Sequence, residues 1–571
     1  MAWWKNSIVY QIYPRSFADG NNDGVGDIPG IIERIPYLAE LGVDVVWLSP
    51  VYRSPMDDNG YDISDYQDIH PEFGTMQDFD RMLETMHQYG IRLIMDLVVN
   101  HSSDEHSWFT MAREGRDSPT RDYYIWRDPA PNGGPPNNWT SFFSGSAWEF
   151  DESSGQYYLH LFSKKQPDLN WENPELRQRI WEMMRWWLDR GVDGFRMDVI
   201  NLISKTPGLP DGVVGDSPLV GTEHYVNGPR FLEFMDEMQR EVLGKYETIT
   251  VGELIDGTRD RALELTRPEL ERLNMIFTFE HVMVDHGPRG KYDPVPFDPA
   301  RLRSVLYTWQ REVAREGWNS LYLSNHDQPR HVSRYGNDQT YWAESAKLWA
   351  LVLHGLRGTP YVYQGEEIGM TNYPFTSIDQ FRDIEALNAY DAMRNEYGMS
   401  DEEALRRLNA HSRDHARTPV QWQADMEEVF PHPWIAVNPN ATAVNVQSQL
   451  KDSNSVWELY RRAIGYRSEL PVLTGDWSAM AEDHPGAFVF ARSCDDQLLL
   501  VLANPTDDAI ELDLATGDFP SGWEQLVAEV NPRLILSSVQ DMRELPRAVS
   551  FEPARVVLQP WEAAWLLWDR R

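Results

Sequence analysis

Short runs of apolar and β-branched residues recur along the chain, and a segment with helical periodicity follows each of them. Strands buried on both faces have continuous apolar runs of this kind, whereas half-exposed strands alternate apolar and polar residues. Eight such runs alternating with helices predict a (β/α)8 (TIM) barrel of the α/β class. The runs span residues 7–14, 42–50, 91–99, 192–199, 248–254, 274–279, 320–324 and 358–365.

The helix before the fourth run is the clearest of the helical segments. Asn173 is a favourable N-cap residue, Pro174 suits the first turn, and Gly191 is a typical helix stop. The apolar face between them consists of Leu176, Ile180, Met183, Met184, Trp187 and Leu188. We therefore predict an amphipathic helix over residues 174–190.

The spacing of the runs predicts an insertion and an extension of the barrel, which itself takes residues 1–103 and 172–482. About a hundred residues separate the third and fourth strands, where a strand and a helix need about thirty. Segment 104–171 is therefore expected to form a small inserted domain over the barrel mouth, after strand 3. Residues 372–460 are expected to extend the last βα connection.

From residue 483 the helical periodicity disappears and strand-like runs follow one another after short turns. This pattern is typical of an antiparallel β-sandwich without helices. We therefore predict a C-terminal β-sandwich domain over residues 483–571. Its runs lie at 487–492, 497–504, 509–514 and 554–568.

Composition restricts the partners and the compartment. The chain has 89 Asp and Glu against 52 Lys and Arg, a formal net charge of −37. Such a surface repels nucleic acid and anionic membranes and suits a neutral or cationic small ligand. A single cysteine, Cys494, allows no intramolecular disulfide, and we find no signal peptide and no apolar stretch of about 20 residues. We expect a soluble cytoplasmic protein; its oligomeric state stays open.

Charged residues gather at the carboxyl ends of the predicted strands, where barrels of this kind build their active sites. A single aspartate at a strand end is most often a helix cap or an ion-pair partner. A whole set at successive strand ends is much harder to explain structurally. The set is Asp96, His101, Arg196, Asp198, Glu253, His326 and Asp327.

Clustered carboxylates without a cysteine pair or a His-rich metal site suit cleavage of a glycosidic bond. Such chemistry needs one carboxyl group protonated near neutral pH and a second one ionised. Arg196 lies two residues before Asp198 on the same strand face and is expected to keep it ionised. Glu253 has no arginine so close in sequence, so its pKa is expected to be raised. Asp198 is therefore the candidate nucleophile and Glu253 the candidate acid/base.

These strand-end motifs resemble those of the α-amylase family of glycoside hydrolases, family 13. The resembling motifs are DLVVNH (96–101), GFRMDVIN (194–201), GEL (252–254) and SNHDQP (324–329), with flanking regions at 42–50 and 358–370. The resemblance implies a retaining mechanism through a covalent glycosyl-enzyme. It also implies that Asp327 is a third catalytic carboxylate and that His101 and His326 bind the same sugar.

A narrower resemblance, to the oligo-1,6-glucosidase and α-glucosidase branch, rests on QPDLNW (166–171), DNGY (58–61) and HARTPVQW (415–422). It implies that Tyr61 stacks on a terminal glucose and that Asp58 and Arg417 pair and bind its 4- and 6-hydroxyl side. Phe143, Phe162 and Gln166 would line the same pocket. A pocket closed in this way implies an exo-acting enzyme for short α-glucosides such as isomaltose and panose.

Val199 follows the candidate nucleophile and has two readings. In the resembling enzymes, valine at this position accompanies α-1,6 preference, and its branched side chain would narrow the entrance against a glucose linked through O4. Alternatively, Val199 only packs the end of the strand.

A separate loop resembles the first part of a calcium-binding EF-hand loop. DGNNDGVGD places Asp19, Asn21, Asp23 and Asp27 at positions 1, 3, 5 and 9, with the carbonyl of Val25 at position 7. Alternating oxygens of this kind suit a structural Ca²⁺, or Mg²⁺, remote from the chemistry. The alternative is a plain turn rich in Asp and Asn.

Several rival functions remain. A trehalose-6-phosphate hydrolase would need a basic cluster for phosphate, which the sequence does not indicate. A broader α-glucosidase acting on α-1,4 links or sucrose, and transglucosylation as a side activity, are compatible with the same motifs. A sucrose isomerase would carry an arginine-rich loop near 279–288, where none is found. A non-catalytic scaffold would lack the carboxylates.

Overall fold

Eight parallel strands form a barrel at the centre of the computed structural model, which describes residues 2–215, 219–514 and 518–570. The strand order is β11-β10-β9-β5-β2-β1-β15-β14, and a bridge between Ile276 and Asn319 joins the two ends. The strands are β1 (Val9–Ile12), β2 (Val45–Leu48), β5 (Arg92–Leu97), β9 (Gly194–Met197), β10 (Ile249–Glu253), β11 (Met275–Phe277), β14 (Ser320–Leu321) and β15 (Thr359–Tyr363). Each lies inside one of the predicted runs, so the predicted barrel is confirmed.

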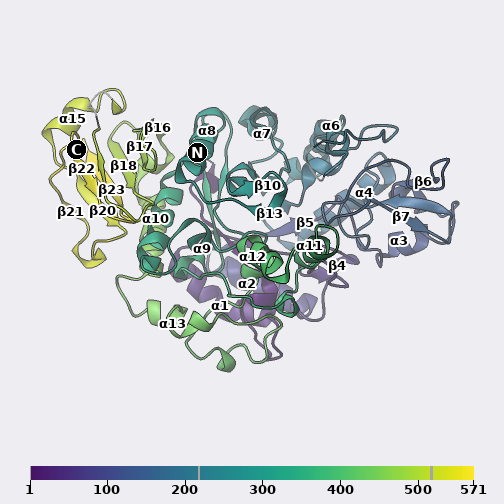
Figure 1. Cartoon of the computed structure of the whole chain (residues 1–571). Helices are drawn as coiled ribbons and strands as arrows, with labels where there is room; N and C mark the ends of the chain where they lie inside the picture. The colour runs from purple at the N-terminus through teal and green to yellow at the C-terminus, as the bar shows by residue number, and fades with distance from the viewer. Residues whose placement is uncertain (1, 216–218, 515–517, 571) are drawn as a thin grey trace.

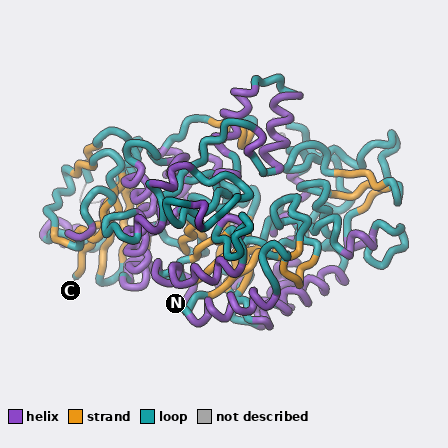
Figure 2. Tube along the Cα trace, turned by 90° about the horizontal axis from the view of Figure 1, so that it is seen from below, coloured by secondary structure: helices purple, strands orange, loops and turns teal. Residues whose placement is uncertain are grey.

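A helix follows each barrel strand, and Figure 2 shows these helices around the orange strands. They are α1 (Ile28–Leu41), α2 (Met76–Gln88), α4 (Pro174–Arg190), α6 (Phe231–Glu241), α7 (Arg259–Thr266), α8 (Pro299–Glu312), α10 (Trp342–Gly355) and α14 (Val456–Glu469). Helix α4 has the predicted bounds: the Asn173 side chain accepts N–H bonds from Glu175 and Leu176, and Gly191 ends the helix with φ 109°.

Alternate residues of each strand face the barrel interior, and this alternation places the candidate catalytic side chains. Val9, Val45, Ile94, Ile249 and Val251 belong to one buried interior cluster, together with Trp47, Met275 and Phe277. In the strand register Asp96 lies beside Arg196, and Arg196 lies beside Val251. Because side chains repeat every second residue, Asp198 and Glu253 follow on the same inner face at the carboxyl end.

The segment expected as an inserted domain carries a three-stranded sheet of order β6-β8-β7 and lies opposite the C-terminal domain in Figure 1. Its elements are α3 (Ser107–Ala112), β6 (Trp126–Arg127), β7 (Trp148–Asp151) and β8 (Gln156–Leu159). Its apolar core is not self-contained. Trp139, Leu159 and Leu161 pack in one cluster with Val199 and Leu209, which follow β9. The insertion therefore shares its core with the segment after the candidate nucleophile.

The segment expected to extend the last βα connection carries α11 (Ile384–Asn395), α12 (Asp401–His411) and α13 (Val446–Gln449). Its expected end at residue 460 falls inside α14. The signal for the true start of α14 is Ser455, whose side chain accepts the N–H of Glu458, an N-cap pattern readable from the sequence.

The C-terminal domain contains a six-stranded antiparallel sheet, β16-β17-β18-β23-β20-β21, and a separate pair, β19-β22. Two details differ from the expectation: β16 pairs with β17 although it begins at Asp476, before residue 483, and a helix interrupts the strands. The elements are β16 (Asp476–Met480), β17 (Phe488–Ser493), β18 (Gln497–Ala503), β19 (Ile510–Leu512), α15 (Glu524–Glu529), β20 (Arg533–Ser537), β21 (Arg547–Ala548), β22 (Val556–Leu558) and β23 (Ala563–Asp569). Strand β16 is mostly half-exposed, so it lacks the apolar run that marks a buried strand.

Shorter helices and strands lie in the connections between the barrel strands and helices. They are β3 (Tyr52–Arg53), β4 (Asp65–Ile69), α5 (Thr222–Tyr225), β12 (His286–Gly287), β13 (Gly290–Pro294) and α9 (His331–Tyr335). Within the described ranges, no helix combines the length and apolar character that crossing a bilayer requires.

Gly194 provides a test of the barrel register. A Cβ at Gly194 would lie 1.9 Å from the carbonyl oxygen of Ile249 on the neighbouring strand. Gly194→Ala should therefore destabilise the protein by about 3 kcal/mol or more, measured by chemical denaturation. Gly115→Ala is the matched control, because nothing lies within 4 Å of its added Cβ. Equal unfolding midpoints for the two variants would contradict this close strand contact.

Candidate active site

One guanidinium group holds three carboxylates at the carboxyl end of the barrel. Arg196 Nη1 lies 2.6 Å from Asp96 Oδ1 and 2.7 Å from Asp198 Oδ1, and Nη2 lies 2.5 Å from Glu253 Oε2. All four side chains are buried. The expected pairing of Arg196 with Asp198 is present, but the expectation that it keeps the pKa of Asp198 low is wrong, because burial outweighs it. Closeness in sequence did not reveal that Arg196 also reaches Glu253, because pairing of β9 with β10 brings the two side chains together.

Burial shifts the protonation of this group. Burial raises the pKa of Asp198 well above its usual range, and the neighbouring Glu253 and Asp96 add to the effect while Arg196 opposes it. Burial also raises the pKa of Glu253, again against Arg196. A single guanidinium cannot neutralise three buried carboxylates, so this group retains a proton near neutral pH. One protonated carboxyl beside an ionised one is what acid-assisted cleavage needs.

Asp327 has the opposite electrostatic environment. Burial raises its pKa, but His326, Arg413 and Arg417 outweigh burial and lower the pKa of Asp327 below its usual range. The nearest contacts are 3.2 Å from His326 Nε2, 3.2 Å from Arg413 and 3.1 Å from Arg417. Burial lowers the pKa of His326 to about 3, so the imidazole is neutral. Asp327 therefore stays ionised and can accept hydrogen bonds from hydroxyl groups.

A second set of side chains lines the same mouth. The Tyr61 ring stacks on His326 with centroids 5.2 Å apart, and the Tyr61 hydroxyl donates to Asp96 Oδ2 at 3.2 Å. Gln166 donates to Asp58 Oδ2 at 3.1 Å and lies 3.3 Å from His101. From the inserted segment, Phe162 packs beside the His101 ring.

The pairing expected between Asp58 and Arg417 differs in the structure. Asp58 contacts Arg413 at 3.3 Å, whereas Arg417 contacts Asp327 at 3.1 Å and Asp383 at 3.3 Å. Arg413 also holds Asp383 at 2.5 Å and lies over the ring of Phe143. Arg413 and Asp383 were missed from sequence. The available signal was the RDHAR stretch, where a turn at Arg413–His415 directs both arginines into the site.

Every catalytic and substrate-binding residue expected from sequence therefore lies in one contact network. Val199 joins it through its backbone, since its N–H donates to Glu253 Oε2 at 3.0 Å. Its side chain is buried in the core of the inserted domain. The geometry combines two carboxyls that contact the same guanidinium, a third that stays ionised, and aromatic and amide side chains beside them.

Comparison with known proteins agrees with this chemistry. Residues 11–476 match the family model described as the alpha amylase catalytic domain. The chain belongs to the α-amylase family of glycoside hydrolases.

Among relatives of this family, the oligo-1,6-glucosidase of Parageobacillus thermoglucosidasius is 55% identical over 88% of this chain and 90% of the relative. The oligo-1,6-glucosidase of Halalkalibacterium halodurans is 54% identical over 98% of both chains. Among solved structures, the trehalose-6-phosphate hydrolase of Bacillus licheniformis matches with a TM-score of 0.92 and 44% identity, covering 100% of each chain. This α-amylase family enzyme is therefore similar to two kinds of α-glucoside hydrolase.

In this α-amylase family enzyme, the side chains of the loop expected to bind calcium accept hydrogen bonds from backbone N–H groups of the same loop. Asp19 accepts N–H bonds from Asn22 at 2.6 Å and from Gly24 at 2.8 Å, and Asp23 accepts one from Val25 at 2.9 Å. Asp27 accepts the N–H of Gly30 and so caps α1. Together with burial, the nearby charges of Asp19 and Asp23 raise the pKa of Asp27. The carboxylates of Asp19 and Asp23 thus lie close enough to Asp27 to affect its protonation.

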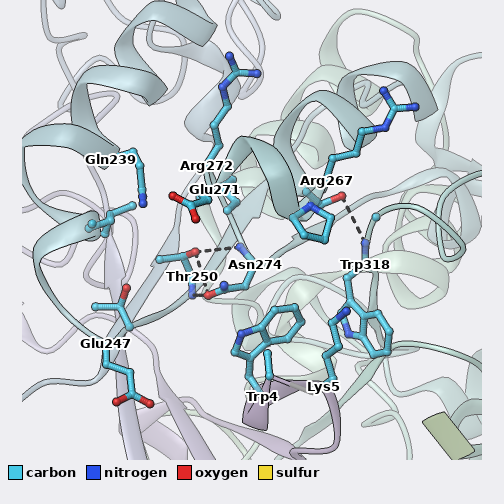
Figure 3. Close-up of a pocket in the computed structure, with 18 of the residues that line it drawn as sticks. Trp4, Lys5, Gln239, Glu247, Thr250, Arg267, Glu271, Arg272, Asn274 and Trp318 are labelled. Carbon is cyan, nitrogen blue, oxygen red and sulfur yellow. Dashed lines mark hydrogen bonds between the residues drawn. The ribbon is translucent and has the colours of Figure 1, made fainter.

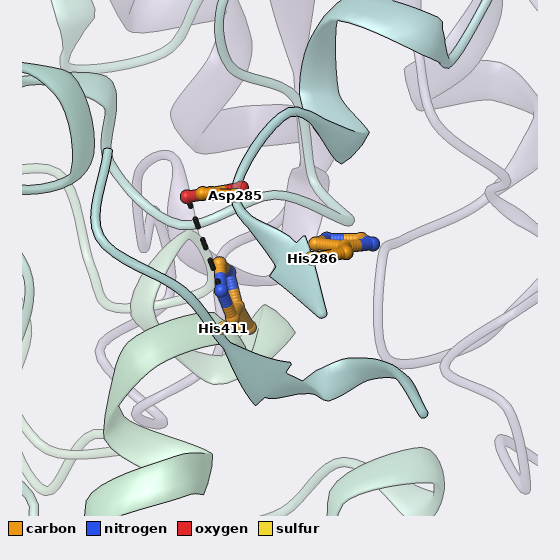
Figure 4. Close-up of side chains that lie close together, drawn as sticks. All are labelled: Asp285, His286 and His411. Atoms are coloured by element: carbon orange, nitrogen blue, oxygen red, sulfur yellow. Dashed lines mark ion pairs between the residues drawn. The ribbon is translucent and has the colours of Figure 1, made fainter. Parts of the chain in front are cut away.

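A different group has the geometry of metal ligands but not the electrostatics. In the described parts of the chain, only Asp285, His286 and His411 offer three ligand atoms within 4.8 Å of one another (Figure 4). Arg334 already holds both oxygens of Asp285, at 2.8 and 2.5 Å, and lies 3.4 Å from His286 Nε2. A guanidinium therefore occupies the cation position beside the imidazoles.

A cavity of about 660 Å³ lies at the other end of the barrel. Its walls include Thr250, Asn274 and Trp318, near the amino ends of β10, β11 and β14, and Figure 3 shows Trp4 and Lys5 beside Trp318. The Lys5 ammonium lies 4.5 Å from the Trp318 ring centre. None of the residues expected in the active site lines this cavity.

Removal of Arg413 tests whether the pocket wall depends on it. Arg413→Met leaves Asp58 and Asp327 without one of their cationic partners, so KM for 4-nitrophenyl α-glucoside should rise about tenfold or more. Stability should fall by about 3–5 kcal/mol, because buried carboxylates lose their partner. Arg382→Met is the control, since Arg382 is exposed and donates only to backbone carbonyls. The same KM in both variants would argue against this role.

Proposed function

We propose that this enzyme is a retaining, exo-acting α-glucosidase that releases glucose from the non-reducing end of short α-glucosides and favours α-1,6 links. Isomaltose, panose and isomalto-oligosaccharides are the substrates we infer. The main supporting observation is that Asp198 and Glu253 share the Arg196 guanidinium, which holds two carboxyls side by side at the barrel mouth. The names of the oligo-1,6-glucosidase relatives add support for the linkage.

The proposed mechanism follows from the positions of the three carboxylates. Asp198 attacks the anomeric carbon while Glu253 protonates the glycosidic oxygen, so the C–O bond breaks and a glycosyl-enzyme forms. Glu253 then takes a proton from water, whose oxygen attacks the anomeric carbon and releases Asp198. Asp327 accepts hydrogen bonds from the 2- and 3-hydroxyls of the sugar. A sugar hydroxyl in place of water would give transglucosylation.

The pocket wall supports action at a chain end. Asp58, held by Arg413 and Gln166, and the Tyr61–His326 stack enclose the side where a further sugar would otherwise lie. A side closed in this way would admit a terminal glucose and disfavour internal attack on long polymers. We infer a neutral oligosaccharide substrate. A cytoplasmic location and the lack of a nucleic-acid partner stay predictions.

Trehalose 6-phosphate is a less suitable substrate. A phosphate group needs cations that are not already neutralised. The cations near this site are paired: Lys291 lies 2.6 Å from Glu385, and Arg413 contacts Asp58, Asp327 and Asp383. The 44% identity to a trehalose-6-phosphate hydrolase makes this the second candidate function nevertheless.

A substrate panel tests the proposal. The wild type should have a higher kcat/KM on isomaltose and panose than on maltose, sucrose or trehalose 6-phosphate, measured by glucose release. Asp198→Asn should lower kcat on 4-nitrophenyl α-glucoside by about 10⁴-fold or more, because no nucleophile remains. A preference for trehalose 6-phosphate would replace the proposal with its rival, and an active Asp198→Asn variant would sink the mechanism.

We also propose that the 19–27 loop binds Ca²⁺, or Mg²⁺, in a structural role. Asp19, Asn21, Asp23 and Asp27 would supply side-chain oxygens and Val25 its carbonyl. Gly24 supports this reading, because its φ of 92° and a Cβ position only 2.2 Å from the His432 carbonyl oxygen suit glycine alone. The ion would neutralise carboxylates that repel one another.

At a free Ca²⁺ concentration of 100 times Kd or more, binding should raise the free energy of unfolding by about 3 kcal/mol. The unfolding temperature of the wild type should therefore rise by a few degrees. Calorimetric titration of chelator-treated protein should give binding near one ion per chain. Asp23→Ser should remove both effects without changing kcat, since the loop is remote from the chemistry. Equal responses to calcium in the two proteins would exclude this loop as the site.

A further inference from the structure

The backbone at Val199 adopts a conformation that valine rarely occupies. Its φ of 36° and ψ of 39° lie in the left-handed region, which a side chain branched at Cβ strongly disfavours. A conformation of this kind persists only where the surrounding structure determines it. Val199 is therefore held in place by contacts on either side.

Two sets of contacts hold it. The side chain is 6% exposed and packs in the same apolar cluster as Trp139, Leu161 and Leu209, so the core of the inserted domain fixes it. On the backbone, Asp198 N–H donates to the Leu97 carbonyl, and the Val199 carbonyl accepts from Leu202 at the start of a 3₁₀ turn over Ile200–Leu202. The chain thus changes direction at Val199.

This turn directs the Val199 N–H toward the candidate acid/base. The N–H donates to Glu253 Oε2 at 3.0 Å, and Arg196 Nη2 reaches the same oxygen at 2.5 Å. Among the described residues, Oε1 of Glu253 has no hydrogen-bond donor. Oε2 is therefore fixed by one hydrogen bond and one ion pair, which leaves Oε1 to carry the acidic proton.

We propose that Val199 is a positioning residue for the acid/base: packing in the core of the inserted domain holds its left-handed backbone, and its N–H orients the Glu253 carboxyl. The proposal rests on the role proposed above for Glu253. It is distinct from the effect of the Val199 side chain on linkage preference, because it concerns the backbone and every substrate that needs protonation.

Leaving-group dependence separates the two roles. A 4-nitrophenolate departs with little protonation, whereas a 4-methoxyphenolate of similar size needs the acid. Glycine at position 199 keeps the N–H but loses the packing and is free to leave the left-handed region. Val199→Gly should therefore lower kcat/KM on 4-methoxyphenyl α-glucoside about tenfold or more beyond any change on 4-nitrophenyl α-glucoside. Val199→Thr, which keeps the branched Cβ, should leave that ratio unchanged within about twofold.

A side chain that only shapes the entrance gives a different result. Val199→Thr would then raise kcat/KM on maltose relative to isomaltose, and Val199→Gly would affect both aryl glucosides equally. That equal effect, in a variant whose unfolding temperature shows it to be folded, overturns the proposal.

A backbone ester provides the sharpest test. Incorporating the α-hydroxy analogue of valine at position 199 removes the N–H and leaves the side chain intact. The same leaving-group dependence is expected, with the alkaline limb of kcat/KM moved to higher pH because the Glu253 carboxylate loses a donor. Unchanged dependence in the ester variant would overturn the proposal.

Glu253→Gln distinguishes failure of this inference from failure of the proposed mechanism. A Glu253→Gln variant that loses activity mainly on 4-methoxyphenyl α-glucoside upholds the acid role whatever the Val199 variants show. Absence of leaving-group dependence in Glu253→Gln would refute the acid role of Glu253 and, with it, the basis of the inference.

Discussion

The Arg196 guanidinium is the contact on which the rest of this active site depends. It lies at the junction of β5, β9 and β10 and holds Asp96, Asp198 and Glu253, each from a different stretch of chain. A buried carboxylate without a partner costs several kcal/mol. One cation for three carboxyls makes their assembly tolerable but leaves at least one proton in the site. The excess of carboxyls over cations costs stability, and the proton that it leaves on the site is what acid catalysis requires.

A strongly acidic composition and several fully buried arginines coexist in this protein. The net charge is −37, yet Arg196, Arg330, Arg417 and Arg492 are among the largest fully buried side chains. Arg330 and Arg492 donate mainly to backbone carbonyls. Arg196 and Arg417, with Arg413, hold carboxylates instead. The fixed geometry of the guanidinium suits this task, because several donors in one plane can bridge groups from different elements.

The inserted domain contacts the candidate active site as well as the barrel. Its core includes Val199, Leu202 and Leu209 from the segment after β9, and Gln166 from its last stretch reaches both Asp58 and His101. The inserted domain therefore contacts the segment after β9 through its apolar core and contacts Asp58 and His101 through Gln166. These contacts explain why a strained residue such as Val199 sits at the boundary.

The sequence by itself determined the barrel, helix α4 and the group of strand-end side chains. Continuous apolar runs, N-cap residues and the two-residue repeat of a strand are local signals, and they sufficed to bring Asp198, Glu253 and Asp327 to one end of the molecule. Only the tertiary structure decided that Arg196 serves Glu253 as well as Asp198, that Arg413 rather than Arg417 meets Asp58, and that Val199 turns left-handed. These are contacts between segments distant in sequence, set by strand register and side-chain packing, and no local pattern encodes them.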